Sequence, residues 1–128
     1  MIVVDASVVA EALRDHTSGY MSVLMTGEAA APAHLDAEVL SVLRGLVRGG
    51  HLKGEDLPVY VDALATAPID RLDIPVLLST AVTMFDNLSA YDALYVSAAL
   101  HHDARLCTRD SGMEQVATRL GVPLVAAT

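Results

Sequence analysis

The amino-acid sequence predicts an α/β fold in which helices pack against a mainly parallel sheet. Short apolar runs typical of strands alternate with stretches of helical periodicity from one end of the chain to the other. The chain has 128 residues, so we expect a single domain over residues 1–128. Its apolar fraction is 53% but its aromatic fraction only 4%, so the core should be built from Ala, Val and Leu.

The first half of the chain is expected to contain two strands. Met1–Ser7 begins with apolar residues and reaches an acid, and Ser7 is a candidate N-cap for a helix over Val8–Arg14. The clearest helix is Ala33–Arg48, whose Leu and Val residues form one apolar stripe before two glycines stop it. Between them we expect a helical piece over Thr17–Met25 and a short strand over Glu28–Pro32.

The second half should supply three more short strands. Ile69–Ile74 alternates apolar and polar residues as a half-buried strand does, and Pro123 in the last strand favours a sheet edge. The expected elements are, in order, helix Gly54–Thr66, strand Ile69–Ile74, helix Val76–Phe85, helix Ser89–His102, strand Arg105–Thr108, helix Ser111–Leu120 and strand Val122–Val125.

Composition argues against several classes of protein. The net charge is −8, with 16 acidic against 8 basic residues, which is unlike a dedicated nucleic-acid binder but compatible with an enzyme whose acids bind metal ions. The single cysteine, Cys107, excludes an internal disulfide and a cysteine-rich zinc site, and suits a reducing cytoplasm. No apolar run reaches the roughly 20 residues that span a bilayer, and the N-terminus lacks the basic region of a signal peptide.

Two acids lie where strands are expected to end. Asp5 follows the first strand, and Asp110 follows the strand Arg105–Thr108. In open α/β sheets, ligands bind beyond the carboxyl ends of the strands, so these two side chains should share one edge of the sheet. A helix N-cap is the competing explanation for Asp110.

Two further acids lie on expected helices. Glu38 falls at the edge of the apolar stripe of its helix, where it is either a solvated boundary residue or a side chain that faces a cleft. Asp92 heads the core-facing stripe of its helix, and it is also placed to form a capping box with Ser89. Asp36, on the other flank of the first stripe, is expected only to interact with the helix dipole.

Four carboxylates that converge without a counter-charge would repel one another and raise one another's pKa values. Mg²⁺ or Mn²⁺ would turn this repulsion into ligation, because hard cations prefer oxygen ligands. A site of this kind can orient and deprotonate a water for attack on a phosphodiester. The four acids are therefore suited to metal-assisted hydrolysis.

Three segments carry a resemblance to a known family. They are MIVVDASVV at the start, APAHLDAEVLSVLR in the clearest helix, and LSAYDALYVSAALHHDARLCTRD near the end. In content and order they resemble the PIN domain and, within it, the VapC toxins of bacterial toxin–antitoxin pairs. The third segment is the most specific, because it joins an acid at the head of a Tyr- and Ala-rich helix to a short strand and a T-x-D motif.

The resemblance implies a fold, a site and an activity. The fold would be a three-layer sandwich, a mainly parallel sheet of about five strands with helices on both faces, commonly dimeric. The protein would be a metal-dependent endoribonuclease held inactive by a cognate VapB-like antitoxin, so that RNA, an antitoxin and a second copy of the chain are the expected partners. The implied catalytic acids are Asp5, Glu38, Asp92 and Asp110; the implied Mg²⁺ or Mn²⁺ ligands are Asp5, Asp92 and Asp110; and Ser7 and Thr108 match small hydroxyl positions beside the site.

One position departs from the family pattern. Many relatives carry a further acid or amide two residues after the last catalytic acid, where this chain has Gly112. We therefore expect one firmly bound metal ion and leave a second open. Arg109 is the expected contact for an RNA phosphate, with a merely solvated arginine as the alternative. The five histidines show no metal-ligand spacing and are expected to be structural.

Two other functions compete with this one. A phosphorelay receiver domain has a similar size and alternation, but it needs a lysine at the end of its last strand, and the only lysine here is Lys53 in mid-chain. A non-catalytic PIN-fold binding module would keep the fold, yet it has no need for clustered carboxylates. An antitoxin segment is expected to lie near Glu38 and bring a basic side chain to the acids, because an acidic pocket attracts cations.

Overall fold

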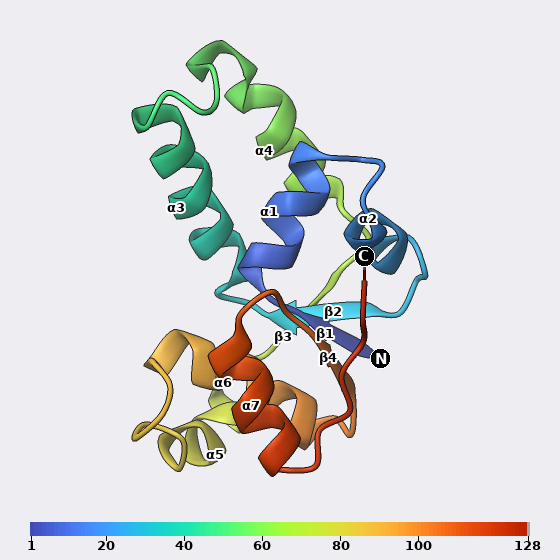
Figure 1. The fold of residues 1–128 in the computed structure, drawn as a ribbon, viewed down its shortest axis with the longest axis vertical. Coiled ribbons are helices and arrows are strands. Elements are labelled where there is room, and N and C mark those ends of the chain that lie inside the picture. The colour runs from blue at the N-terminus through green and yellow to red at the C-terminus, as the bar shows by residue number, and fades with distance from the viewer. Residues whose placement is uncertain (128) are drawn as a thin grey trace.

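A parallel sheet forms the middle layer of the structure, a computed structural model that describes residues 1–127. Its strands are β1 (Ile2–Val4), β2 (Ala29–Pro32), β3 (Asp70–Leu72) and β4 (Arg105–Cys107), in the order β3-β2-β1-β4. One face is covered by α1 (Ala6–Arg14), α2 (Gly19–Leu24), α3 (Leu35–Arg48) and α4 (Leu57–Thr66), and the other by α5 (Leu78–Val82), α6 (Ala90–His101) and α7 (Ser111–Arg119) (Figure 1). The predicted sandwich with helices on both faces is confirmed.

The strand order places a crevice at the carboxyl end of β1. Ile2 pairs with Ala29 of β2 on one side and with Arg105 of β4 on the other, both in parallel. The chain winds outward from β1 through β2 to β3, and then returns to the opposite side of β1 to form β4. Loops diverge at such a reversal and leave room for a ligand, so the residues after β1 and β4 border the same crevice.

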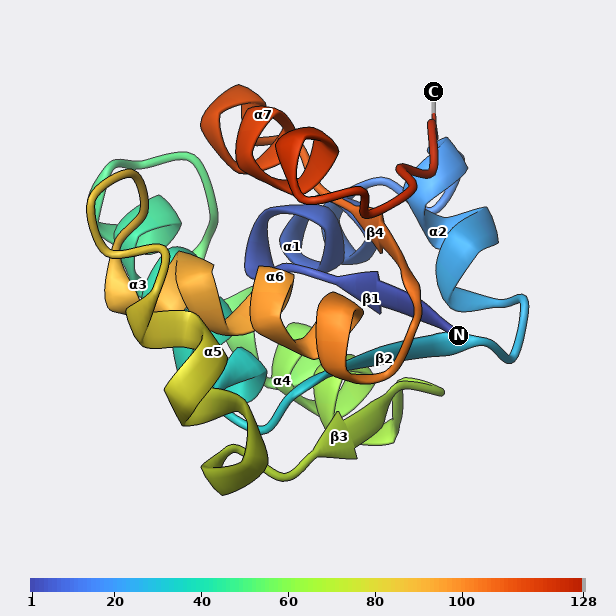
Figure 2. The same ribbon diagram turned by 90° about the horizontal axis from the view of Figure 1, so that it is seen from below.

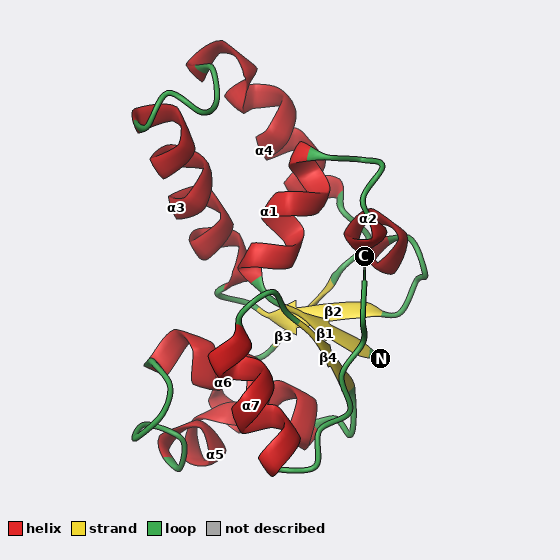
Figure 3. Cartoon of the chain, in the orientation of Figure 1, coloured by secondary structure: helices red, strands yellow, loops and turns green. Residues whose placement is uncertain are grey.

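The prediction of a fifth strand over Val122–Val125 is wrong: this segment forms only a single β-bridge. Leu124 pairs with Leu106, whose N–H donates to the carbonyl of Pro123 at 2.9 Å and whose carbonyl accepts from Val125 at 2.8 Å. Pro123 has no N–H to extend the ladder. The described sheet therefore has four strands rather than about five, and the segment after α7 is drawn as loop (Figure 3).

The predicted helices form with shifted ends. The helix expected over Gly54–Thr66 divides into a 3-10 turn, η1 (Gly54–Asp56), and α4, with its proline in the first turn. The helix expected over Val76–Phe85 divides in the same way into η2 (Pro75–Leu77) and α5. The helix expected from Val8 begins at Ala6, because Asp5 and not Ser7 is its N-cap.

The core consists mainly of small aliphatic side chains, as the composition predicts. Val3 and Val4 of β1 and Leu106 of β4 are completely buried. Helix α6 lies across the face of the sheet opposite to α1 and α3 (Figure 2), and its residues from Ala93 to Ala99 are all buried. This packing fixes the start of α6, and with it Asp92, beside the crevice. None of the helices within residues 1–127 is long and apolar enough to cross a membrane.

Candidate active site

Asp5 is buried where β1 turns into α1, with only 4% of its surface exposed. Its Oδ1 accepts hydrogen bonds from the backbone N–H of Val8 at 3.0 Å and from the Ser7 hydroxyl at 2.7 Å. Its Oδ2 accepts a hydrogen bond from the Thr108 hydroxyl. A buried carboxylate needs such donors, and the strand–helix junction supplies them. Ser7 and Thr108 thus lie against Asp5, where the sequence places them.

Asp110 borders the same crevice from the loop between β4 and α7. Its Oδ1 accepts from the backbone N–H of Met113 at 2.9 Å, so it caps α7. Its own N–H donates to Oγ1 of Thr108 at 3.0 Å, and that hydroxyl in turn donates to Asp5. Thr108 therefore links the two acids that follow β1 and β4, and the helix cap holds Asp110 at the crevice.

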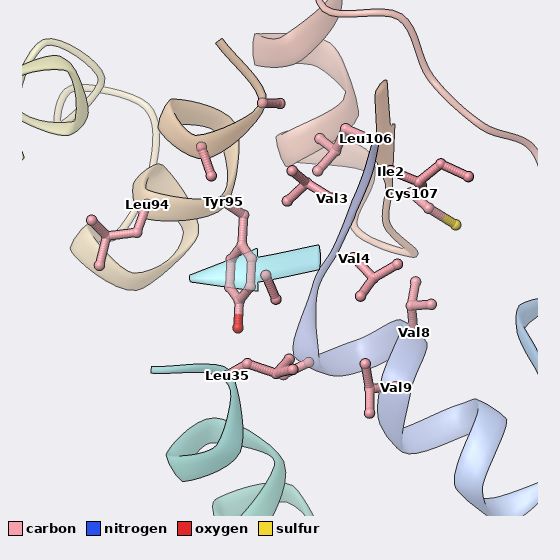
Figure 4. Packing of buried hydrophobic residues seen from close by; sticks show 14 of the residues in the cluster. Ile2, Val3, Val4, Val8, Val9, Leu35, Leu94, Tyr95, Leu106 and Cys107 are labelled. Carbon is pink, nitrogen blue, oxygen red and sulfur yellow. The ribbon is translucent and has the colours of Figure 1, made fainter. Parts of the chain in front are cut away.

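Glu38 reaches the crevice from α3, and two neighbouring side chains contact one of its carboxylate oxygens. The Tyr95 hydroxyl donates to Oε1 at 2.7 Å, and Nε2 of His34 lies 3.1 Å from the same atom. Tyr95 is 1% exposed, and Figure 4 shows its hydroxyl directed toward the helix that carries Leu35. Burial raises the pKa of Glu38, but the bonds from His34 and Tyr95 outweigh this and hold that pKa below its usual range. Glu38 is therefore ionised at neutral pH.

Asp92 enters the site from the first turn of α6, where its N–H donates to Oγ of Ser89 at 3.2 Å. Burial, followed by the negative charges of Asp110, Glu38 and Asp5, raises the pKa of Asp92. Burial also raises the pKa of Asp5, against the hydrogen bonds that lower it. Burial and the neighbouring carboxylates thus both disfavour the negative charges of Asp5 and Asp92, which a bound cation would stabilise.

All four acids line one pocket of about 410 Å³, together with Ser7, Tyr95 and Arg109. Each acid comes from a different part of the fold: the start of α1, the first turn of α3, the start of α6 and the start of α7. Val42 and Leu46 also line the pocket. The apolar stripe predicted along α3 is therefore divided between the core, which takes Leu35, Val39 and Leu43, and the wall of this pocket.

The carboxylate oxygens of the pocket are the type of ligand that a hard cation prefers, although they do not surround one position on all sides. Within residues 1–127, no three His, Cys, Asp or Glu side chains lie close enough together to hold a metal ion by themselves. Mg²⁺ usually binds one or two carboxylates and keeps several of its waters. An open pocket with Asp5, Asp92 and Asp110 on its walls suits that coordination, and the raised pKa values of Asp5 and Asp92 favour a positive charge between them.

Arg109 lies at the mouth of the pocket, but it already has partners. Its Nη1 donates to Oε2 of Glu11 at 3.2 Å, and its guanidinium is 5.7 Å from the centre of the Tyr20 ring. Arg14 shares the same Glu11 oxygen at 3.7 Å. Two guanidinium groups on one carboxylate leave an excess of one positive charge at the pocket mouth. A phosphate contact for Arg109 stays a prediction.

His34 is the site residue that sequence reasoning missed, because all the histidines were expected to be structural. The signal was its spacing from Glu38, four residues along the same helix, which brings two side chains together. Its Nδ1 is buried, and no described residue offers that atom a hydrogen bond. Asp36 is excluded from the site, since its carboxylate binds Arg71 through two hydrogen bonds of 2.8 and 3.2 Å.

Comparison with known proteins identifies the family of this fold and site. A family model of the PIN domain matches residues 2–119. The chain belongs to the PIN domain family. It is 36% identical over 112 residues to Ribonuclease VapC3 of Mycobacterium tuberculosis, which is 85% of this chain and 82% of that protein. The resemblance predicted from the three sequence segments is confirmed.

Solved structures share the fold at lower sequence identity. PAE2754 from Pyrobaculum aerophilum superposes with a TM-score of 0.71 at 18% identity, covering 94% of this chain and 96% of that one. FitAcB from Neisseria gonorrhoeae superposes with a TM-score of 0.70 at 20% identity, covering 98% of this chain and 97% of that one. At these identities the similarity establishes the fold.

Proposed function

We propose that this protein is a metal-dependent endoribonuclease that acts as the toxin of a toxin–antitoxin pair. The observation that carries the proposal is the convergence of Asp5, Glu38, Asp92 and Asp110 on one pocket. The similarity to a protein named Ribonuclease VapC3 supports RNA as the substrate. The chemistry of the four carboxylates supports hydrolysis of a phosphodiester.

Asp5, Asp92 and Asp110 would hold Mg²⁺, or alternatively Mn²⁺. When bound, such an ion lowers the pKa of a water and balances the negative charge that develops on the phosphate. Oδ1 of Asp5 already accepts two hydrogen bonds, but Oδ2 accepts only the one from Thr108, so a second lone pair of Oδ2 is available. The Ser7 and Thr108 hydroxyls fix the direction of that lone pair, which keeps the site ordered before substrate binds.

Glu38 would orient and deprotonate the attacking water. Both of its contacts, from Tyr95 and His34, are made to Oε1, so Oε2 is the oxygen that accepts a hydrogen bond from a water. Its lowered pKa keeps it in the ionised form that can take a proton. The water oxygen then forms a bond to phosphorus as the water proton passes to Oε2, the bond from phosphorus to the leaving ribose oxygen breaks, and that oxygen takes up a proton from solvent.

Cleavage of structured RNAs in Mg²⁺, with EDTA as the control, tests this function. We expect cleavage by the wild type, none in EDTA, and none by Asp5→Asn or Asp92→Asn. Asp36→Asn is the matched control, because Asp36 lies on the same helix as Glu38 but is bound to Arg71. Equal cleavage by the wild type and the Asp5 and Asp92 variants would contradict the site. No cleavage of any RNA would favour the alternative, a non-catalytic binding module.

A VapB-like antitoxin is the partner we propose for the same pocket. Val42 and Leu46 offer an apolar wall next to Glu38, and the acids offer a counter-charge for a basic side chain. Binding should therefore weaken with salt and in the Asp92→Asn variant. An antitoxin that binds equally well in high salt and to that variant would remove the electrostatic part of the proposal.

A homodimer is the assembly we propose. Val76, Leu78, Val82 and Phe85, in and after η2 and α5, are each more than half exposed, which is the kind of surface that a second copy covers. Light scattering should give the mass of a dimer for the wild type and of a monomer for Val82→Glu. A monomeric wild type would contradict the proposal.

A further inference from the structure

A second hollow opens beside the acid pocket and shares a wall with it. Its volume is about 610 Å³, and Glu38 and Val42 line both spaces. The remaining lining residues are His34, Ala37, Ser41 and Tyr91. One ligand could therefore place a group at the acids and the next group along its chain in this hollow.

The aromatic ring of Tyr91 lines the hollow and is supported on one side by His34. The side chain is 62% exposed although it directly precedes Asp92. Its ring lies 5.8 Å from the His34 ring at an interplanar angle of 30°, and its carbonyl oxygen lies 3.1 Å from Nε2 of His34. The His34 ring in turn packs against the buried Tyr95 ring at 4.7 Å. The orientation of Tyr91 is thus fixed from the core side, while most of its surface is open.

Exposed aromatic side chains are scarce in this chain, which has four Tyr, one Phe and no Trp. Tyr95 is buried, Tyr20 lies under the guanidinium of Arg109, and Tyr60 is partly buried against the core. Phe85 is exposed but lines neither hollow. Tyr91 is the aromatic residue available to a ligand that is bound at the acids.

We propose that Tyr91, braced by His34, forms a subsite for an unpaired nucleobase of the RNA next to the scissile phosphate. The inference rests on the proposed ribonuclease function and extends it to substrate binding. A protein of net charge −8 gains little from general attraction to phosphates, so contacts to bases have to supply a larger share of the affinity. Stacking on an aromatic ring holds unpaired bases of any sequence, and the Ser41 hydroxyl is a polar group for the base edge.

Binding of a short RNA under conditions without cleavage tests the subsite. The probe is a fluorescein-labelled hexauridylate, followed by anisotropy with Ca²⁺ in place of Mg²⁺, beside the same strand with abasic riboses. We expect the wild type to prefer the strand with bases by about 5- to 150-fold, the range that base–aromatic stacking gives. Tyr91→Leu should lose the preference and Tyr91→Phe should keep it. Phe85→Leu, a matched change of an exposed aromatic residue, should also keep it.

The outcomes separate this inference from the proposed function. A preference that Tyr91→Leu retains, a wild type without a preference, or a wild type that binds neither strand would overturn the subsite. Equal RNA binding by the wild type and Tyr91→Leu would leave the hollow to a protein partner. If the preference depends on Tyr91 but no RNA is cleaved in Mg²⁺, the subsite stands and the nuclease function fails. Melting temperatures measured by circular dichroism verify that the variants are folded.

Discussion

Replacing Tyr95 by Phe should destabilise the fold through the loss of one hydrogen bond to Glu38. The hydroxyl donates to Oε1 at 2.7 Å, and hydrogen bonds to charged groups contribute about 1.5–3 kcal/mol. Phe keeps the buried ring, so no cavity forms. The Glu38 side chain is 26% exposed and keeps its contact with His34, so water replaces part of the lost bond. We therefore expect a cost of about 1–1.5 kcal/mol in the free energy of unfolding.

The pH dependence of this cost follows from the pKa of Glu38. Because that pKa is held below its usual range, the ionised carboxylate contributes stability that is present above the unfolded-state pKa and is lost as pH falls through the folded-state pKa. Tyr95 supplies part of this stability. The difference between the wild type and Tyr95→Phe should therefore be full at neutral pH and shrink below about pH 4.

Urea unfolding followed by circular dichroism measures both the cost and its pH dependence, since the chain has no Trp to follow by fluorescence. The same change should cost less in a Glu38→Gln background, where the acceptor carries no charge. Tyr60→Phe on α4 is the matched control and should cost little at either pH. A Tyr95→Phe cost that is as large in acid, or as large beside Gln, would refute an interaction with the carboxylate.

Three further predictions concern the charges around the pocket. Asp92→Asn removes a negative charge that its surroundings disfavour, so it should raise the free energy of unfolding at neutral pH by a few tenths to about 1 kcal/mol. The gain is small because Asp92 is partly exposed to solvent, which screens the charge. Because the pKa of Asp92 is raised, the charge destabilises the fold fully above the folded-state pKa and not at all below the unfolded-state pKa. In acid, Asp92→Asn should therefore be no more stable than the wild type. Mg²⁺ should raise the melting temperature of the wild type and have little effect on Asp5→Asn; an equal rise in both would place the metal elsewhere. Arg109→Ala should raise KM for RNA and flatten its salt dependence with kcat nearly unchanged, whereas Arg44→Ala, exposed on α3, should do neither.

Much of the candidate site could be predicted because its acids lie at positions that the local sequence pattern marks, such as strand ends and the edges of apolar helix stripes. Asp5 and Asp110 follow strands, and parallel strands bring their carboxyl ends to one edge. Asp92 and Glu38 are marked by their places relative to the apolar stripes of two helices. The choice between Asp5 and Ser7 as N-cap could not be made in advance, because both side chains accept hydrogen bonds well and only the exact turn of the backbone decides.

The parts that could not be predicted depend on contacts between distant segments. Tyr95 and Glu38 are 57 residues apart, and nothing in their local spacing indicates a hydrogen bond between them. Arg109 looked available for phosphate, but Glu11 and Tyr20 reach it from α1 and α2. The last strand had a suitable apolar pattern, yet Pro123 and the edge position reduced it to one bridge.

The sequence by itself determined the order of strands and helices, the parallel character of the sheet and the acids that border it, because apolar periodicity, caps and strand ends are local signals. Only the tertiary structure decided how these acids are held and what surrounds them. It joined Asp5 to Asp110 through Thr108, fixed one oxygen of Glu38 between His34 and Tyr95, and set the ring of Tyr91 beside the pocket. The physical reason is that each contact joins segments far apart in the chain: Thr108 links the ends of β1 and β4, and the starts of α3 and α6 meet beside them, so no single element encodes these contacts.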